Sequence, residues 1–365
     1  MEEMSFFVPG RTELGGNHTD HQGGCILGGA LSLGISALAH RNGTDTVHIE
    51  SKGFGVCDVE IGDTEPRPEE KGSFSAFVRG VLDTFLESGN VFGGFDAMIE
   101  SEIPVGSGLS SSAAFSVLIG KIVSGLFFED TVPELFLAQA AKRAENDFFG
   151  KPCGLMDPLI CAVGQTVFAD FANEHAPFYK PVSFDFSSLS YRMALIDSGS
   201  SHENLTADYA AIPREMHLIA GELGHELLSE ADAAEFYAVF PILRQKYGDR
   251  PAFRAHHFFS ETARAQEEAK ALEDGDFEYF LTLFRESAES SETYLQNIVS
   301  PNEPEKRLLK AIETARELLH GEGGVRVHGG GFAGMAQAFV PAEKADAFAE
   351  KMAAAGFPCL FPELL

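Results

Sequence analysis

Alternating apolar and polar residues mark one clear strand in the first half of the chain. Phe95, Ala97, Ile99 and Ile103 alternate with more polar neighbours, which is the spacing of a half-buried β-strand. Helical spacing follows at 112–128 and 133–149. The second helical stretch has Thr131 as a candidate cap, Pro133 near its first turn and Gly150 just past its end, which are helix start and stop signals. This region is therefore predicted to fold as a strand followed by two helices.

The texture of the pattern changes along the chain. Short β-like and helical runs alternate up to about residue 186, whereas 213–319 is almost wholly helical, with breaks at Gly248 and Gly275. A glycine-rich turn at 321–334 precedes a predicted strand at 335–340 and a last amphipathic helix near 342–355. The pattern predicts an α+β protein of two domains, residues 1–190 and residues 191–365.

Composition and charge narrow the class of partner. The 365 residues carry 27 Lys and Arg against 55 Asp and Glu, a net charge of −28, which argues against nucleic acid and anionic membrane as partners. No two of the 5 cysteines have CxxC spacing, so neither a zinc ribbon nor a disulfide framework is indicated. The uncharged run at 23–39 is expected to be a buried strand or helix. The acidic N-terminus does not match a secretory signal, and a cytoplasmic location is expected.

A run of glycines and serines at 104–114 lies between a predicted strand and a predicted helix. Such a turn brings backbone N–H groups close to an anion, and the helix N-terminus adds positive dipole. The run does not match GxxxxGK[ST], and it is not GxGxxG because Ser111 stands where the third glycine would be. Taken alone, it fits a helix capped by serine equally well.

Polar side chains crowd between glycines at 9–24, where Arg11, Asn17, His18 and Asp20 lie close together in the sequence. Such a set suits a sugar, because each hydroxyl needs a donor or acceptor in a fixed direction. The alternative is a solvated loop in which Asp20 and His18 bond to their own backbone.

Two further segments give only weak evidence of a functional role by themselves. Asp157 stands before Pro158 and an apolar helical stretch, so it can be the N-cap of a helix with Pro158 at N1. Glu145 lies near the end of its predicted helix and would ordinarily be a solvated surface charge. The glycine-rich segment 325–334 fits either a tight hairpin or a backbone approach to phosphate.

In this order, the four segments together resemble the GHMP small-molecule kinases and, within that superfamily, the galactokinases. PGRTELGGNHTDHQGG is similar to the family's sugar-binding motif, PVGSGLSSSAA to its phosphate-binding motif, GKPCGLMDP to the segment with its catalytic aspartate, and VHGGGFAG to its C-terminal glycine motif. Similarities at 77–80 and 283–301 extend the resemblance over nearly the whole chain. The resemblance implies a two-domain GHMP kinase fold with the active site in the cleft between the domains.

The resemblance also implies a reaction, in which the γ-phosphoryl of ATP is transferred to the C1 hydroxyl of galactose with the help of Mg²⁺. Asp157 would take or orient the proton of that hydroxyl, with Arg11 beside it. Ser112 (or Ser111) and Glu145 would hold the magnesium. The implied ligand-binding positions are Asn17, His18, Asp20, Gly154 and Tyr209 for the sugar, and Gly106, Ser107, Gly108, Leu109, Ser110, Ser111 and Ser112 for the nucleotide.

The chain departs from the family pattern at three positions. Asn17 stands where galactokinases usually carry Glu, so the charge-assisted strength of a hydrogen bond to the sugar is lost. Pro158 replaces a common Gln, and His328 replaces a small hydroxyl residue. The alternatives are a kinase for a related hexose, such as galacturonate or N-acetylgalactosamine, and a sugar- and ATP-binding sensor without catalysis. Only small-molecule partners are expected, with the chain a monomer or a weak homo-oligomer.

Overall fold

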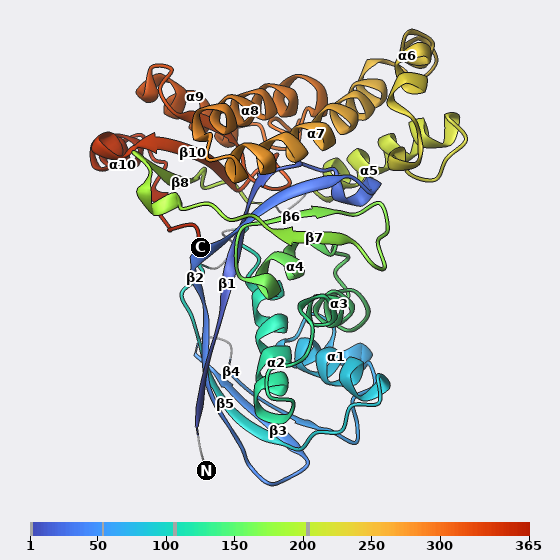
Figure 1. Cartoon of the computed structure of the whole chain (residues 1–365), viewed down its shortest axis with the longest axis vertical. Helices are drawn as coiled ribbons and strands as arrows, with labels where there is room; N and C mark the ends of the chain where they lie inside the picture. Colours follow the sequence, from blue (N-terminus) through green and yellow to red (C-terminus); the bar gives the residue numbers. More distant parts are fainter. Residues whose placement is uncertain (1–2, 53–54, 105–107, 202–204) are drawn as a thin grey trace. The chain divides into compact units, whose positions relative to one another are not determined.

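The structure, a computed structural model, describes residues 3–52, 55–104, 108–201 and 205–365 (Figure 1). The chain forms two compact units. Unit 1 comprises Met1–Arg11 and Ala30–Gln165, and unit 2 comprises Thr12–Gly29 and Thr166–Leu365. This division differs from the single boundary near residue 190 that the sequence pattern predicts. The physical reason is that strands β1 (Met4–Gly15) and β2 (Cys25–Arg41) are long enough to contribute residues to both units.

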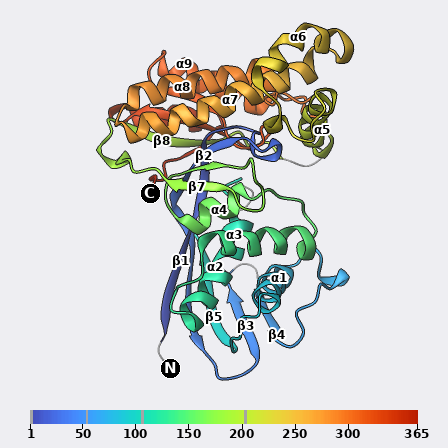
Figure 2. The ribbon, with the colours of Figure 1, turned by 45° about the vertical axis from the view of Figure 1, so that its right-hand side comes forward.

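Unit 1 is a sheet covered by helices. Its strand order is β4-β3-β5-β2, in which β3 pairs parallel with β5 and the other pairs are antiparallel. Helices α1, α2 and α3 lie on one side of this sheet in both views (Figures 1 and 2). The elements not yet given are β3 (Thr46–Ser51), β4 (Gly55–Glu60), β5 (Phe95–Ser101), α1 (Phe74–Glu87), α2 (Ser111–Phe127), α3 (Glu134–Arg143) and α4 (Met156–Val163).

The predicted strand and two helices of unit 1 are confirmed, with corrections at their ends. Pro133, not Thr131, precedes the first residue of α3, and a π-helical turn (Ala144–Phe149) continues it to a left-handed Gly150. The prediction that Asp157 caps a helix is wrong. Helix α4 begins at Met156 after Leu155, so Asp157 lies inside its first turn. There its carboxylate still faces the positive end of the helix dipole.

Unit 2 contains a four-stranded antiparallel sheet of order β11-β8-β10-β9. The predicted strand at 335–340 is β10, and the short strand β9 in the glycine-rich segment pairs antiparallel with it, which agrees with the hairpin alternative for 325–334. Residues 25–28 of β2 pair with β6, which in turn pairs with β7. The elements of unit 2 are β6 (Val167–Asp170), β7 (Phe178–Pro181), β8 (Tyr191–Asp197), β9 (Gly324–Val327), β10 (Met335–Pro341), β11 (Cys359–Leu360), α5 (Thr206–Glu222), α6 (Ala233–Tyr247), α7 (Asp249–Glu273), α8 (Phe277–Ser290), α9 (Arg307–Leu319) and α10 (Ala345–Ala354).

Helix α7 buries a stripe of polar side chains. Arg254, His257, Glu261 and Glu268 are each at most 2% exposed, and their spacing of three, four and seven residues places them on one face of the helix. Buried charges need partners, so this face determines where other polar groups of unit 2 can lie. Across the described residues, no helix combines the length and the apolar character that crossing a bilayer requires.

Candidate active site

Unit 1 brings Arg11 and Asp157 together as a two-point ion pair, although they are far apart in the sequence. Arg11 Nε donates to Asp157 Oδ1 at 2.6 Å, and Nη2 donates to Oδ2 at 2.7 Å. Arg11 Nη1 donates to the Gly108 carbonyl at 2.9 Å, which ties the pair to the serine-rich loop. The planar guanidinium matches the carboxylate in a fork geometry that fixes both side chains.

Asp157 is ionised at neutral pH. Burial by itself would raise its pKa, but the charge of Arg11 and the hydrogen bonds from Arg11 and Ser110 hold the pKa below the ordinary 3.8. The hydroxyl of Ser110 donates to Oδ2. The side chain is 31% exposed, so its carboxylate can be reached from solvent. A carboxylate held ionised in this way is a weak base, and it is better suited to accept a hydrogen bond from a donor hydroxyl than to remove its proton.

The serine-rich loop reaches the first turn of α2 as predicted. Gly108 and Ser110 have left-handed backbone angles, with φ of +70° and +60°, and Ser110 directly precedes Ser111, the first residue of the helix. Leu109 is buried, and its carbonyl accepts from Arg11 N–H at 3.3 Å. Leu109 therefore anchors the loop, while the serines lie at the helix N-terminus. Gly106 and Ser107 fall outside the described residues.

Ser112 and Glu145 form a second polar pair in unit 1. Ser112 Oγ donates to Glu145 Oε1 at 3.0 Å, and Lys151 Nζ lies 3.2 Å from the same oxygen. Glu145 is 3% exposed rather than a solvated surface charge. A hydroxyl and a carboxylate are the oxygen donors that Mg²⁺ prefers. The described residues hold no group of three or more His, Cys, Asp or Glu side chains that could bind a metal ion, so magnesium here would need phosphate and water oxygens as further ligands.

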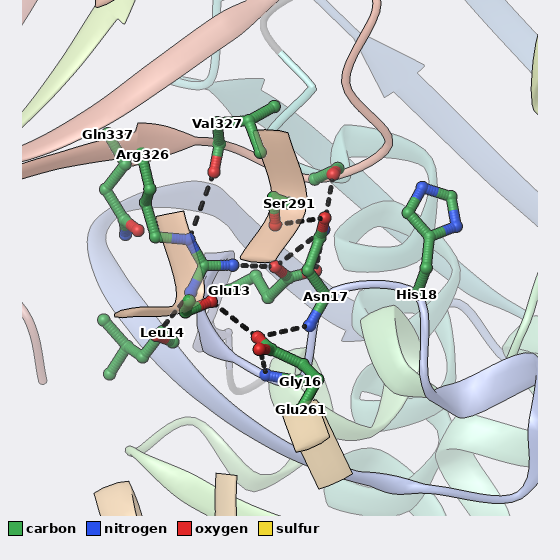
Figure 3. A network of polar contacts seen from close by, with 12 residues as sticks. Glu13, Leu14, Gly16, Asn17, His18, Glu261, Ser291, Arg326, Val327 and Gln337 are labelled. Carbon is green, nitrogen blue, oxygen red and sulfur yellow. Dashed lines mark hydrogen bonds and ion pairs between the residues drawn. The ribbon is translucent and has the colours of Figure 1, made fainter. Parts of the chain in front are cut away.

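Asn17, expected to contact the sugar, is fully buried inside unit 2 (Figure 3). Its Nδ2 donates to Glu13 Oε1 at 3.0 Å and to the Gly329 carbonyl at 2.7 Å. Its Oδ1 accepts from Asn297 Nδ2 at 2.9 Å and from Ser291 Oγ at 3.3 Å. Because a carboxylate only accepts, Glu13 fixes which way the Asn17 amide points. Asn17 therefore links segments of unit 2 through its hydrogen bonds, and all of the donors and acceptors of its amide are used within the protein.

Two more of the predicted sugar residues bond to the same glycine loop. His18 Nε2 lies 3.0 Å from the Gly330 carbonyl, and Tyr209 Oη donates to the Gly331 carbonyl at 2.6 Å. Burial lowers the pKa of His18 to about 4, so the neutral imidazole donates from Nε2. The first and last motifs of the sequence thus meet at residues 329–331. The remaining predicted sugar residues are placed separately, with Asp20 half-buried on a short 3₁₀ turn of unit 2 and Gly154 exposed in unit 1.

Sequence reasoning missed the buried charges behind this loop. Arg326 is fully buried and forms an ion pair with Glu13, and its Nη1 donates to the Leu14 carbonyl at 2.8 Å. Glu261 accepts from the backbone N–H groups of Gly16 and Asn17, each at 3.3 Å. Glu13 and Arg326 lie inside the motif segments 9–24 and 325–334, so their positions in the sequence could have drawn attention to them. Glu261 lies on α7, outside every motif, and nothing in the sequence pointed to it. Of the departures from the family pattern, Pro158 is buried in the first turn of α4 and His328 is also buried.

The glycine loop predicts a stability effect. Gly331 has φ of +78°, and a Cβ there would lie 2.1 Å from the Asn297 carbonyl oxygen. Gly331→Ala is expected to lower the free energy of unfolding by about 2–5 kcal/mol, from strain and overpacking together. Gly321→Ala is the matched control, because its φ is +86° but nothing lies within 4 Å of the added carbon. It should lose only about 1–2 kcal/mol. Equal losses in urea unfolding would contradict this assignment.

Known proteins are similar to this chain in sequence. The GHMP kinases N terminal domain matches residues 76–165, and the galactokinase galactose-binding signature matches residues 2–41. Galactokinase of Enterococcus faecalis is 30% identical, over 94% of this chain and 87% of the relative. Galactokinase of Streptococcus thermophilus is also 30% identical, over 95% of this chain and 87% of the relative.

Solved structures support the same relationship. Lactococcus lactis galactokinase complexed with galactose superposes with a TM-score of 0.83 at 25% identity, covering 100% of this chain and 93% of that one. Methanococcus jannaschii mevalonate kinase gives 0.69 at 15% identity, covering 100% of this chain and 99% of that one, which shows the shared GHMP kinase fold alone. The chain belongs to the galactokinase family of the GHMP kinases.

Proposed function

We propose that this protein is an ATP-dependent sugar kinase that transfers the γ-phosphoryl group of ATP to the C1 hydroxyl of galactose, giving galactose 1-phosphate and ADP. The observation that carries the proposal is the two-point pair of Arg11 and Asp157 beside the serine-rich loop. Phosphoryl transfer needs positioning and charge neutralisation more than covalent chemistry. An ionised carboxylate, a buried arginine and a helix N-terminus supply these.

The side chains of unit 1 divide the work. Asp157 accepts a hydrogen bond from the C1 hydroxyl and turns its oxygen lone pair toward the γ-phosphorus. Arg11 keeps Asp157 ionised and stabilises the charge on the transferring group. Ser111 and Ser112, in the first turn of α2, present backbone N–H groups and hydroxyls to the phosphates. The γ-phosphorus–oxygen bond to ADP breaks as the bond to the sugar oxygen forms, and the hydroxyl proton leaves through Asp157 or water.

Magnesium, as the counter-ion of ATP, would be held by Glu145 and Ser112, where it neutralises phosphate charge. Glu145→Gln removes the charged ligand but keeps the shape. We expect the Mg²⁺ concentration for half-maximal rate to rise about tenfold, the cost of roughly 1.4 kcal/mol in metal binding. Asp147→Asn is the matched control, because Asp147 lies on the same π-helical turn but is exposed. An unchanged magnesium dependence in Glu145→Gln would remove this residue from the metal site.

Coupled ADP release tests the substrate assignment. Purified protein is given ATP and Mg²⁺ with galactose, galacturonate or N-acetylgalactosamine in parallel. Turnover of galactose with the highest kcat/KM supports the proposal. Asn17 in place of Glu is what raised a related hexose as the alternative, and faster turnover of galacturonate or N-acetylgalactosamine would move the assignment to that sugar. If no sugar leads to ADP release while the protein still binds ATP, the result would favour a non-catalytic sensor.

We expect the hexose and ATP to be the protein's only partners. We expect the chain to be a monomer or a weak homo-oligomer and to be located in the cytoplasm.

A further inference from the structure

A cavity of about 280 Å³ lies within unit 2, whereas the residues assigned above to catalysis, Arg11 and Asp157, belong to unit 1. It is bounded by α5, by the start of α7 and by the segment that follows α8. Its lining residues are Ala207, Asp208, Ala211, Arg214, Arg250, Arg254, Gln296, Val299, Pro301 and Phe332. In a chain with 27 basic and 55 acidic residues, a cavity with three arginines and one aspartate is an exception to the overall charge.

The sequence places these arginines on facing helix surfaces. Ala207, Ala211 and Arg214 follow one another at four- and three-residue spacing on α5, so the two small alanines leave room in front of the arginine. Arg250 and Arg254 are one turn apart on α7, where two like charges repel. Both helices therefore contribute positive charge to the lining of the cavity.

One buried carboxylate compensates for only part of this charge. Glu215 accepts from Arg250 Nε at 3.1 Å and from Arg254 Nη1 at 2.9 Å. Asp208 is engaged on the opposite wall, where its Oδ2 accepts from Ser300 Oγ at 2.6 Å and from Asn302 Nδ2 at 2.9 Å. With Glu215 and Asp208 both counted against three arginines, one positive charge is in excess.

Two arginines keep donors for a ligand. Arg214 is exposed and makes no hydrogen bond or ion pair with any other described residue. Arg254 is 2% exposed, and its Nε donates to the Leu295 carbonyl at 3.0 Å. Its second Nη atom has no partner within the described parts of the chain. Burial lowers the pKa of Arg254, and the charge of Glu215 opposes this effect.

We propose that this cavity binds a small phosphate dianion, either inorganic phosphate or the phosphate group of a small ester. Arg214 and Arg250 would contact it at the rim, and Arg254 at the base. Guanidinium groups match phosphate oxygens in charge and in fork geometry. The cavity is smaller than pockets that enclose drug-sized ligands, which suits a compact anion. The proposal concerns unit 2 alone and does not depend on the proposed function.

Isothermal titration of the full-length protein with potassium phosphate tests this site, with potassium chloride at equal ionic strength as the blank. We expect Arg214→Gln to weaken phosphate binding roughly threefold to tenfold, the effect of losing one exposed charge-assisted contact. Arg214→Gln/Arg250→Gln should abolish it. Arg254 is left intact because its removal would strand Glu215. Arg192→Gln is the matched control, an exposed arginine of unit 2 outside the cavity with a side chain 47% exposed, and it should bind like the wild type.

The variants also separate this cavity from the serine-rich loop, which can bind phosphate through its backbone. Phosphate binding that persists unchanged in the double variant lies elsewhere and overturns the proposal, as does a wild-type protein that does not bind phosphate. The same titration is repeated with glucose 1-phosphate, as a small phosphate ester, and with acetate, as an anion of single charge. Dependence of both phosphate sources on Arg214, with weak acetate binding, is the expected result. Acetate binding as tight as that of phosphate would overturn the assignment of a dianion site.

Discussion

Asp157→Asn is expected to lower kcat for sugar phosphorylation by about 10²–10⁴-fold, the range typical for loss of a positioned acid–base group. The amide keeps the shape of the side chain, but one of its two terminal atoms becomes a donor that faces the donors of Arg11 or Ser110. The hydroxyl of the sugar then loses its charged acceptor, and Arg11 loses its counter-charge. ATP binding should change little. Asp147→Asn, at the exposed position of the π-helical turn, is the matched control and should keep full activity.

The pH dependence makes this prediction sharper. The pKa of Asp157 is held below 3.8 in the folded protein, so the carboxylate stays ionised from pH 5 upward and should produce no acid limb in kcat there. Its folded pKa is depressed, so its contribution to stability is present above the unfolded value and is lost as the pH falls through the folded value. An acid limb near pH 6 that disappears in Asp157→Asn would contradict the assigned ionisation. Full activity of Asp157→Asn would show that Asp157 is not a catalytic residue.

Much of unit 1 could be predicted because its signals are local. The alternation from Phe95 to Ile99 and the Pro133 and Gly150 signals lie within the elements that they specify. The serine-rich loop was placed correctly between a strand and α2 for the same reason. Asp157 was misplaced by two positions, at the N-cap instead of the second residue of α4, because an Asp-Pro pair is compatible with either the N-cap or the first turn. Its contact with Arg11 joins residues 146 positions apart, so local spacing gives no sign of it.

The polar interior of unit 2 could not be predicted, since it depends on contacts between remote segments. Asn17 looked like a sugar ligand because it belongs to a cluster of polar side chains that suits sugar hydroxyls and because the family resemblance implies that position. In the structure, it lies against Glu13, Asn297 and the Gly329 carbonyl. Glu268 is buried, and neither of its carboxylate oxygens has a hydrogen-bond partner among the residues that the structure describes. Burial raises its pKa well above 4.5. Nothing in the spacing of α7 distinguishes such a residue from a solvated glutamate.

Asn17→Asp is expected to lower the free energy of unfolding by about 3–5 kcal/mol, the cost of an uncompensated buried charge. Aspartate has almost the same shape as asparagine, but it replaces the Nδ2 donor by an acceptor that faces Glu13 Oε1 and the Gly329 carbonyl. Glutamate, the usual family residue here, would add the same charge against Glu13. Urea unfolding measured between pH 5 and 8 checks the prediction. Asn17→Leu is the control, because it loses the same hydrogen bonds without adding charge.

The charge and the lost hydrogen bonds differ in their pH dependence. Repulsion and burial raise the pKa of the new carboxyl in the folded state, so the penalty is present above that pKa and fades as the pH falls and the group becomes protonated. The deficit of Asn17→Asp should therefore shrink toward pH 5, while that of Asn17→Leu stays constant. Glu13→Gln/Asn17→Asp should recover part of the loss, because a glutamine can donate to the new carboxylate. A deficit independent of pH, or a double variant whose loss is the sum of the single losses, would show that Glu13 does not fix the Asn17 amide.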